Sequence, residues 1–428
     1  MRICFQIDNN TFILPFYRIA LRFAAVPSNE LLNDTVCKIT KGKKPLLIDA
    51  TDNFKPSSFD SYLFTHVFIY LTDNCNLKCD YCYYCSGGDG KPSLDKKSIK
   101  KIVERIFRNA IILRQMRRNY QVQFIISGGG EPTFEWDSLV YTVDLIREYQ
   151  QRYSINAHIG LSTNATLLTE ARVLFLDEKI DNVQVSFDCL EQVQCKQRPM
   201  VNGENSYYAA LLGLRHLDNV KMNYSIRTVV EREHYPLIPK MIEAIFKQFH
   251  NVKGINIVPC DNAGRAYSRG ESIANLSEFY DYFIAVEKDS HENKQYVTSS
   301  MFNMTPKINY CMSPFAETVY YHANGKVLPC AENIGDGYDF VTQKNRLLLY
   351  DEWYEPMKKM CSNCFARYYC GTGCPNKRKR TEDGFFKNED DLIFCNMQKR
   401  YVSYKVTQKL EEYEKTSGKS TEYYTVQV

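Results

Sequence analysis

The amino-acid sequence predicts an α/β protein built on an open, partial (β/α)6 barrel that resembles a shortened TIM barrel and is followed by a small cysteine-rich domain. Strand and helix patterns alternate from about residue 66 to residue 260, which is typical of βαβ units and a parallel sheet. Six such units are too few for a closed eight-stranded barrel. Beyond the barrel, seven of the sixteen cysteines recur between residues 311 and 395.

The expected strands are short apolar runs, and the segments between them carry apolar residues at three- and four-residue spacing. The strands are predicted at 66–72, 122–127, 157–162, 182–187, 223–230 and 254–259, and the clearest helices at 98–116 and 138–151. We divide the chain into an N-terminal extension (1–60), the barrel (61–265), a helical connector (266–310), a cysteine-rich domain (311–397) and a C-terminal helix with a polar tail that frays (398–428).

Length and composition exclude several classes of protein. A chain of 428 residues with 44% hydrophobic residues can bury a sizeable core in two or three domains. The net charge of only +4 does not point to a nucleic-acid partner. No segment approaches the ~18 apolar residues of a membrane span, and no signal peptide is visible. We therefore expect a cytoplasmic protein, in which clustered cysteines bind metal more often than they form disulfides.

Unusual residues follow five of the six predicted strands. The carboxyl ends of barrel strands are where such folds carry their active sites, so these residues are expected to share one site. They are the cysteine cluster 75–85, the turn 128–132, Thr163 and Asn164, Asp188, and the segment 261–265.

The first cysteine cluster offers three thiolates, Cys75, Cys79 and Cys82, from one loop. A structural zinc site needs four ligands, and Cys85 would crowd the same loop as a fourth. A [4Fe–4S] cube held by three cysteines would instead leave one iron open. We expect the remaining cysteines outside the two clusters to be small buried side chains, namely Cys4, Cys37, Cys85, Cys189, Cys195 and Cys260.

The spacing Cys75-x3-Cys79-x2-Cys82, with Tyr81 before the last cysteine, resembles the motif of the radical S-adenosylmethionine (SAM) superfamily. The resemblance implies that the open iron chelates SAM, and that reduction splits SAM into a 5′-deoxyadenosyl radical. It implies SAM contacts from Tyr81 (adenine), from Gly129, Gly130 and Glu131 (methionine amino group), from Ser186 and Asp188 (ribose side), and from Asn164 in a further matching segment. Arg198 and Arg227 are weaker candidates for the SAM carboxylate.

The second group of cysteines reads Cys311, Cys330, Cys361-x2-Cys364-x5-Cys370-x3-Cys374 and Cys395. Taken alone, the four central residues could form a Cys4 zinc site. All seven together resemble a SPASM domain, an auxiliary iron–sulfur module of radical SAM enzymes. The resemblance implies an auxiliary cluster I on Cys311, Cys330 and Cys374 and a closed auxiliary cluster II on Cys361, Cys364, Cys370 and Cys395. Some members of the family have a further cysteine between the first two, which this chain lacks. Cluster I would then either keep an open iron, which we favour, or be completed by a residue such as Glu317 or a distant cysteine. The cofactors would be SAM and three [4Fe–4S] clusters.

Enzymes of this type mostly modify peptides or proteins, so the resemblance implies an oxidoreductase with a precursor peptide as partner and a flavodoxin- or ferredoxin-type reductant. We favour a maturase of ribosomally made peptides that forms C–C, cyclophane or thioether crosslinks, with Glu332 as proton acceptor. An anaerobic sulfatase-maturating enzyme is the alternative, although the Asp that follows the second auxiliary cysteine in that family is Ala331 here.

A non-catalytic iron–sulfur electron carrier or a zinc protein is the alternative from another class. Residues 1–60 would either recognise a leader peptide by strand addition or cover the barrel.

Overall fold

The computed structural model divides the chain into two compact units. The barrel unit comprises residues 56–300 and 313–346, and the terminal unit comprises residues 1–55, 301–312 and 347–428. The structure describes residues 4–15, 19–43, 63–117, 120–260, 264–269, 274–293, 295–302, 304–305, 318–328, 359–373, 380–381, 384–385, 389–417 and 423–428.

A nine-stranded sheet forms the barrel unit, in the order β10-β9-β8-β7-β6-β5-β4-β11-β12. The strands β4 to β9 are all parallel and lie in chain order, which confirms the predicted α/β fold with six successive parallel strands. Strand β10 extends the sheet beside β9, and β11 lies parallel to β4 at the other side. The bounds are β4 His66–Tyr70, β5 Val122–Ser127, β6 Ala157–Thr163, β7 Asn182–Ser186, β8 Tyr224–Val230, β9 Val252–Pro259, β10 Val297–Thr298, β11 Thr318–Tyr321 and β12 Val327–Leu328.

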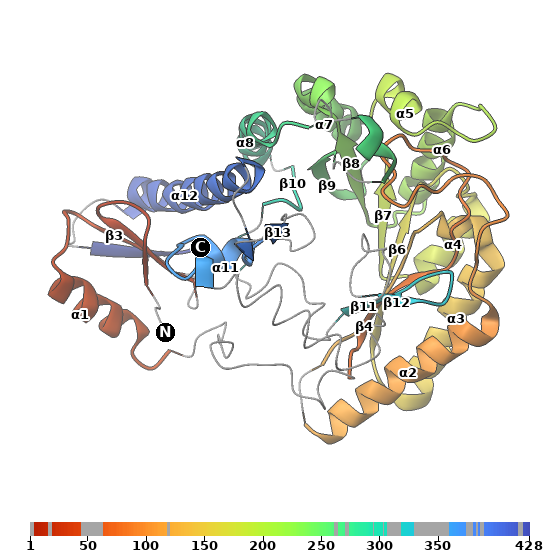
Figure 1. Cartoon of the computed structure of the whole chain (residues 1–428), viewed down its shortest axis with the longest axis horizontal. Helices are drawn as coiled ribbons and strands as arrows, with labels where there is room; N and C mark the ends of the chain where they lie inside the picture. The colour runs from red at the N-terminus through yellow and green to blue at the C-terminus, as the bar shows by residue number, and fades with distance from the viewer. Residues whose placement is uncertain are drawn as a thin grey trace. The chain divides into compact units, whose positions relative to one another are not determined.

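Helices connect the parallel strands and cover the outer face of the sheet (Figure 1). They are α2 Lys96–Gln115, α3 Trp136–Tyr153, α4 Glu170–Lys179, α5 Glu191–Gln197, α6 Ser206–Asn219, α7 Ile238–Gln248 and α8 Leu276–Glu292. Four of them begin at an Asp, Asn or Thr whose side chain accepts a backbone N–H of the first turn, which satisfies a donor that has no partner within the helix. These capping residues are Asp95, Thr169, Asn205 and Asn275.

The two faces of the sheet differ in polarity. In β5, residues alternate between buried and half-buried along the whole strand. Phe124 points to the buried side, where its ring stacks on that of Phe107 from α2 at 6.0 Å between centroids. The opposite face lines a cavity of about 240 Å³ near the amino ends of the strands, with polar side chains from His66, Gln123, Ser162, Asn182, Gln184 and Thr318. Val67, Phe68, Ile125 and Leu161 also line this cavity, so its wall is mixed in polarity.

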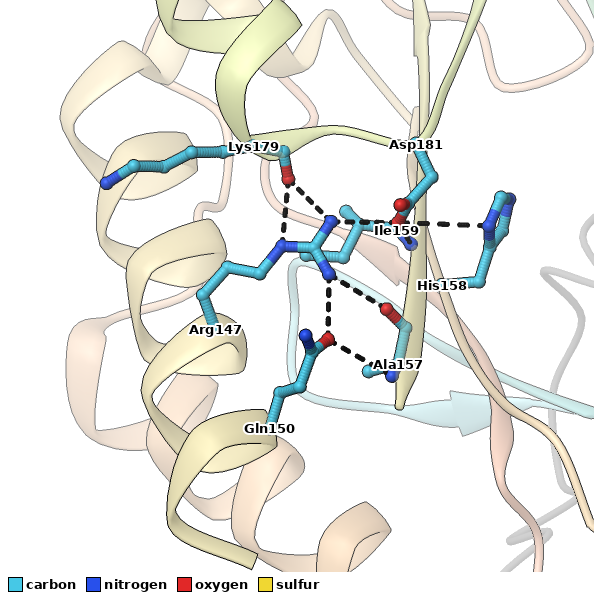
Figure 2. A network of polar contacts seen from close by, with 7 residues as sticks. All are labelled: Arg147, Gln150, Ala157, His158, Ile159, Lys179 and Asp181. Carbon is cyan, nitrogen blue, oxygen red and sulfur yellow. Dashed lines mark hydrogen bonds and ion pairs between the residues drawn. The ribbon is translucent and has the colours of Figure 1, made fainter. Parts of the chain in front are cut away.

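A polar network fixes the amino end of β6 to the neighbouring helices (Figure 2). The Arg147 guanidinium of α3 donates to the carbonyl oxygens of Lys179 and Ala157, to Gln150 Oε1 and to Asp181 Oδ2. Two of these acceptors also bind β6 directly. Asp181 Oδ2 accepts the backbone N–H of Ile159 (2.7 Å), and Gln150 Oε1 accepts that of Ala157 (3.2 Å). This network joins α3, β6 and the segment before β7 at the end of the sheet opposite the cysteine loop.

The terminal unit combines the two ends of the chain. Its sheet has the order β1-β2-β3-β15, and the C-terminal β15 pairs antiparallel with β3 over five residue pairs. Phe5 and Ile13 from this sheet share a core with Tyr368, Val402 and Val406. The elements are β1 Phe5–Gln6, β2 Thr11–Leu14, β3 Ile19–Phe23, α1 Asn29–Thr40, α11 Arg367–Cys370, β13 Arg380–Thr381, β14 Gly384–Phe385, α12 Glu389–Ser417 and β15 Tyr423–Gln427. The expectation of a frayed tail is wrong for residues 423–427, because pairing with β3 orders them.

Candidate functional site

The first cysteine cluster lies in the loop that follows β4. Cys75 forms an isolated antiparallel bridge with Gly88, through two backbone hydrogen bonds of 3.0 and 2.8 Å. The backbone N–H of Leu77 points to Cys75 Sγ, and that of Ser86 points to Cys82 Sγ, each at 3.4 Å. Hydrogen bonds of this kind favour thiolates and occur around iron–sulfur clusters.

The positions of the sulfur atoms can be compared with those of a zinc site. Tetrahedral zinc with Zn–S bonds of ~2.3 Å brings its sulfur ligands ~3.8 Å apart. Among the residues that the structure describes, only Glu231, Glu233 and His234 bring three ligand atoms within 4.8 Å of one another, and the Lys196 ammonium already pairs with Glu233 at 2.5 Å. The structure thus does not bring the three sulfurs of this loop to the mutual separation of a zinc site.

Burial controls the protonation of these thiols. It raises the pKa of Cys75, and it raises the pKa of Cys79 to about 12, although the nearby Arg198 charge opposes the shift at Cys79. Without a cluster, both thiols therefore hold their protons at neutral pH. Because only thiolates bind iron, assembly of a cluster here must release protons.

Arg265 closes the cysteine loop from the segment after β9. Its backbone N–H donates to Cys82 O at 3.0 Å, and its guanidinium donates to the carbonyl oxygens of Cys79 and Ser86. The preceding Gly264 has φ of +56°, and a Cβ there would lie 2.4 Å from Tyr83 Cα. Sequence reasoning placed 261–265 at this edge of the sheet but did not identify Arg265 as a support of the cysteine loop.

The glycine turn after β5 packs directly on the loop that precedes Cys75. Gly130 N donates to Thr72 O and Glu131 N donates to Asn74 O, both at 2.8 Å. A Cβ on Gly130 would lie 1.9 Å from Asn74 O, so only glycine allows this approach.

Glu131, which the resemblance assigns to the SAM amino group, is engaged within the protein. Its carboxylate is buried and accepts hydrogen bonds from Thr133 N (3.0 Å), Thr133 Oγ1 (2.6 Å), Thr163 Oγ1 (2.7 Å) and Asn164 N (2.7 Å). Burial raises the pKa of Glu131, and these hydrogen bonds oppose the shift. The carboxylate therefore joins the ends of β5 and β6.

Asn164 continues this connection towards the cysteine loop. Its side chain donates to Asn76 Oδ1 at 3.0 Å and accepts from Thr166 N and Thr166 Oγ1 at 3.0 and 2.7 Å. The next residue, Ala165, has φ of +60°, a left-handed conformation that disfavours side chains.

Asp188 lies at the centre of a second buried network at the end of β7. It accepts five hydrogen bonds, from Tyr81 OH (2.9 Å), Gln197 Nε2 (3.2 Å), Arg198 Nε (2.9 Å), Thr228 Oγ1 (3.3 Å) and Val229 N (3.1 Å). Burial lowers the pKa of Arg198, but the Asp188 charge and hydrogen bond, together with Tyr81 and Cys79, outweigh this effect and keep the pKa raised. Asp188 thus fixes Tyr81 and Arg198 near Cys79 through hydrogen bonds within the protein, without a bound ligand.

Arg198 keeps two donor groups available. Its guanidinium lies over the Tyr81 ring, 5.1 Å from the centroid, and only Nε bonds to Asp188. Within the described part of the chain, neither Nη group has an acceptor. By contrast, Arg227 and Ser186 are paired neighbours on β8 and β7, both half-buried, and Arg227 has partners of its own. Of the two arginines, Arg198 is therefore the better placed to bind a carboxylate.

Four of the seven predicted auxiliary ligands lie in the described part of the terminal unit. Cys361 and Cys364 share one turn, with Cys364 N donating to Cys361 O at 3.0 Å. Burial raises the pKa of Cys364, and the nearby Cys395 of α12 adds to the shift, so these two cysteines approach each other. Cys370 is buried at the end of α11. Cys311, Cys330, Cys374 and Glu332 lie outside the described residues.

The expectation for the other cysteines holds only in part. Cys189 and Cys260 are buried, but Cys37 and Cys85 are exposed, and Cys4 and Cys195 are half-buried. Cys85 has φ of 54° and closes a turn in which its backbone N–H donates to Cys82 O at 3.2 Å.

Tyr84 and His322 form a contact that sequence reasoning missed, between the cysteine loop and the hairpin β11–β12. Tyr84 OH lies 3.0 Å from His322 Nδ1, and the two rings stack with centroids 5.8 Å apart. Burial lowers the pKa of His322 to about 4, so the imidazole is neutral at physiological pH. The contact joins residues 238 positions apart in the chain, and no local pattern predicts it.

Comparisons with known proteins agree with this geometry. Residues 69–236 match the sequence profile of the radical SAM superfamily. A cysteine-type anaerobic sulfatase-maturating enzyme of Clostridium novyi (strain NT) is 24% identical over 364 residues, which cover 77% of this chain and 92% of that relative.

Two solved structures share the fold. Native anSMEcpe with bound AdoMet and Cp18Cys peptide has a TM-score of 0.63 at 17% identity and covers 81% of this chain and 99% of its own. Streptococcus suis SuiB bound to the precursor peptide SuiA has a TM-score of 0.56 at 14% identity and covers 86% and 87%.

The chain therefore contains a radical SAM domain over residues 69–236, and SAM and a [4Fe–4S] cluster are the cofactors that this family implies. Cys75, Cys79 and Cys82 fit a role as cluster ligands by their spacing, and Cys75 and Cys82 also by their N–H···S contacts. None of the helices in the described ranges is both long and apolar enough to cross a membrane.

Proposed function

We propose that this protein is a SPASM-type radical SAM maturase that oxidatively crosslinks side chains of a ribosomally synthesised precursor peptide. When bound, the cluster and SAM supply a 5′-deoxyadenosyl radical that removes a hydrogen atom from the substrate. Oxidation to a crosslink then requires that the substrate also lose a proton and an electron. The observation that carries the proposal is the loop with Cys75, Cys79 and Cys82, three thiols that would leave one iron of a cluster open, in a chain whose second cysteine group would supply further metal ligands.

Two features support a peptide as substrate. SuiB, which shares the fold over 86% of this chain, was solved with a precursor peptide, and anSMEcpe was solved with a peptide. The inner face of the barrel sheet carries Gln123, Ser162, Asn182 and Gln184 among apolar side chains, so amide groups of a peptide that reached this cavity would find hydrogen-bond partners there.

The auxiliary clusters complete the proposal. Cys361, Cys364, Cys370 and Cys395 would hold auxiliary cluster II, and Cys311, Cys330 and Cys374 would hold auxiliary cluster I with its open iron. Together with a flavodoxin- or ferredoxin-type reductant, these clusters would provide electron transfer to and from the barrel. Glu332 remains our candidate for the proton acceptor, on its position after Cys330 alone.

Sulfatase maturation is the second candidate, because the relative from Clostridium novyi aligns over most of both chains. In that family an Asp follows the second auxiliary cysteine and acts as the base, whereas this chain has Ala331 after Cys330. We favour crosslinking for this reason.

The first test asks whether the protein cleaves SAM. Anaerobically reconstituted protein should form 5′-deoxyadenosine from SAM when reduced with dithionite. The triple variant Cys75→Ala, Cys79→Ala, Cys82→Ala should form none while it retains auxiliary iron. Product formation by the triple variant, or zinc in place of iron in the isolated protein, would refute the assignment of this loop and favour an electron carrier or a zinc protein.

The second test separates the two substrates. The protein is co-expressed with short peptides encoded by neighbouring genes and, in parallel, with a sulfatase-derived peptide that contains the Cys or Ser to be modified. Crosslinking predicts the loss of two hydrogen atoms per crosslink by mass spectrometry, without an aldehyde. Formation of an aldehyde that reacts with a hydrazine on the sulfatase peptide alone would establish the alternative.

A further inference from the structure

His322 is a buried histidine with one ring nitrogen engaged by the protein and the other unpaired. The residue is 1% exposed, and its Nδ1 lies 3.0 Å from Tyr84 OH. Its Nε2 is among the buried polar atoms of the described chain that form no hydrogen bond. An unpaired nitrogen of this kind is unfavourable unless a bound molecule supplies the partner. Nε2 is therefore available to a substrate.

The pleat of the sheet places His322 on the interior face of the barrel. Side chains alternate along a strand, and β11 contributes Thr318 to the wall of the interior cavity. Two residues further, Tyr320 stacks on Phe68, which lines the same cavity, with ring centroids 4.5 Å apart. His322 continues this alternation, because its backbone N–H donates to Lys326 O at 2.9 Å and extends the β11–β12 hairpin. Its side chain thus lies on the interior face, at the end next to the cysteine loop.

Two neighbours determine which nitrogen of His322 carries the hydrogen. Tyr84 OH forms a hydrogen bond with the Asp73 carboxylate, and both side chains lie against Gly129. A carboxylate can only accept, so the single hydroxyl hydrogen of Tyr84 points to Asp73. The Tyr84 oxygen then accepts from His322, which places the imidazole hydrogen on Nδ1. Nε2 consequently carries a lone pair and can accept a proton.

The titratable groups described around His322 come from three elements. Tyr70 of β4 packs edge-on, with ring centroids 4.8 Å apart, Tyr84 belongs to the cysteine loop, and Lys326 lies in the hairpin itself. Burial and, to a lesser extent, the Lys326 charge lower the pKa of His322 to about 4. The imidazole is therefore neutral at physiological pH, with its lone pair free before a substrate binds.

We propose that His322 Nε2 is the proton acceptor of the oxidative crosslinking step. The inference rests on the proposed function and assigns a residue to its last step. Removal of a hydrogen atom leaves 5′-deoxyadenosine and a carbon radical on the substrate. That carbon forms a bond to the accepting side chain, and one electron passes to an oxidised iron–sulfur cluster. The proton displaced from the accepting atom passes to Nε2, so the two hydrogens lost per crosslink are accounted for.

A weak base is sufficient for this step. Bond formation and loss of the electron leave positive charge on the accepting side chain, which makes its proton far more acidic than an imidazolium with a pKa of about 4. The described surroundings of Nε2 favour His322 over Glu332, whose candidacy rests on its sequence position. The experiment therefore includes both residues.

The first measurement locates the hydrogen on the imidazole. Full-length protein labelled with ¹⁵N-histidine, with its clusters reconstituted and oxidised, is studied by NMR at pH 7. The His322 signals are assigned by their absence from the variant His322→Asn. The inference predicts hydrogen on Nδ1 and none on Nε2. Hydrogen on Nε2 in wild type would overturn it, whatever the substrate is.

The second measurement compares crosslinks with 5′-deoxyadenosine, on the neighbouring-gene peptides used above. In His322→Asn, an amide takes the position of Nδ1 beside Tyr84, but no atom replaces Nε2. General base catalysis contributes about 100- to 10,000-fold, so crosslinks per 5′-deoxyadenosine should fall at least about 100-fold. Iron content and SAM cleavage should match those of wild type. His250→Asn is the matched control at an exposed position and should crosslink as wild type does.

His322→Gln is the second variant, in case His322→Asn does not fold. It should show the same loss, because an amide does not accept a proton at neutral pH. The inference is overturned if crosslinks form at the wild-type ratio, or if Glu332→Gln loses them while the His322 variants do not. Lower iron content or SAM cleavage in both His322 variants would also overturn it, by making His322 a support of the cysteine loop. Wild type that crosslinks no peptide, with Nε2 unprotonated, would count against the proposed function alone.

Discussion

Replacing Gly130 by alanine should separate the glycine turn from the cysteine loop. The new Cβ would lie 1.9 Å from Asn74 O and 2.6 Å from Asn74 C, both backbone atoms that cannot rotate away. Because ordinary contact begins near 3.4 Å, the two segments must move apart by about 1.5 Å, the difference between 3.4 and 1.9. That shift breaks the hydrogen bonds Gly130 N to Thr72 O and Glu131 N to Asn74 O, each 2.8 Å long.

The cost of this substitution can be worked from its parts. Two backbone hydrogen bonds contribute about 1 kcal/mol each, and forced overpacking costs about 1–3 kcal/mol. The free energy of unfolding should fall by about 3–5 kcal/mol, a large share of the roughly 5–15 kcal/mol that stabilises a typical protein. Because the displaced segment leads directly into Cys75, the variant should also bind less iron at the first cluster.

Denaturation in guanidinium chloride, followed by circular dichroism, measures the stability, and iron per chain after reconstitution measures the site. Gly90→Ala is the control: Gly90 has φ of +72° and no atom within 4 Å of its Cβ position, so it should lose only the ~1–2 kcal/mol of a left-handed side chain. Equal losses in the two variants, or a full iron content in Gly130→Ala, would refute the close approach as the reason for this glycine.

Three further predictions concern other contacts. Arg147→Met removes five hydrogen bonds and should lower the unfolding free energy by about 2–4 kcal/mol, with SAM affinity unchanged. A weaker SAM affinity would contradict this prediction, as would a loss of stability no larger than that caused by Arg152→Met at an exposed position. His322→Asn should flatten the pH dependence of stability between pH 6.5 and 4. The unfolded histidine takes up a proton near pH 6.5, whereas the folded one does so near pH 4. The free energy of unfolding of wild type therefore falls as pH drops through this window, by up to about 3 kcal/mol. Parallel pH profiles of the two proteins would exclude this cause. Arg198→Lys should weaken SAM about 10-fold but leave decarboxylated SAM unaffected; an equal loss for both would show that Arg198 does not bind the carboxylate.

The barrel strands could be predicted because their signal is local. The segment 122–127 was expected as a strand and forms β5 with the same bounds, since its alternating side chains meet helices on one face and the barrel interior on the other. The first strand ends at Tyr70 instead of residue 72. Thr72 leaves the ladder to form an isolated bridge with Ser93, and that partner is 21 residues away in the chain.

Strands that depend on distant partners were not predicted. Strand β11 pairs with β4 across about 250 residues of sequence, and β15 pairs with β3 across about 400. The segment YYTVQ alternates as a strand does, but it lies in a polar sequence that by itself indicates a tail. Its order comes from the open edge of β3, which satisfies backbone groups that the local sequence cannot.

For the site, residue types and spacing identified the groups but not their partners. The cysteines, the glycine turn, Asn164 and Asp188 were selected correctly as residues that gather at one edge of the sheet, because parallel strands bring their carboxyl ends together. What each side chain binds depends on atoms from other strands. Arg265 and His322 could not be selected, since an arginine after a strand and a histidine in a hairpin have many other uses.

The two saturated carboxylates show how the site can exist before its cofactor binds. Glu131 connects the glycine turn to the end of β6, and Asp188 connects β7, β8 and the segment that carries Arg198. A carboxylate that accepts four or five protein hydrogen bonds cannot also reorganise around a ligand without losing them. Both residues therefore act as positioning groups for the loops that would contact SAM. Loss of either charge should therefore impair SAM binding through the positions of Cys75, Tyr81 and Arg198.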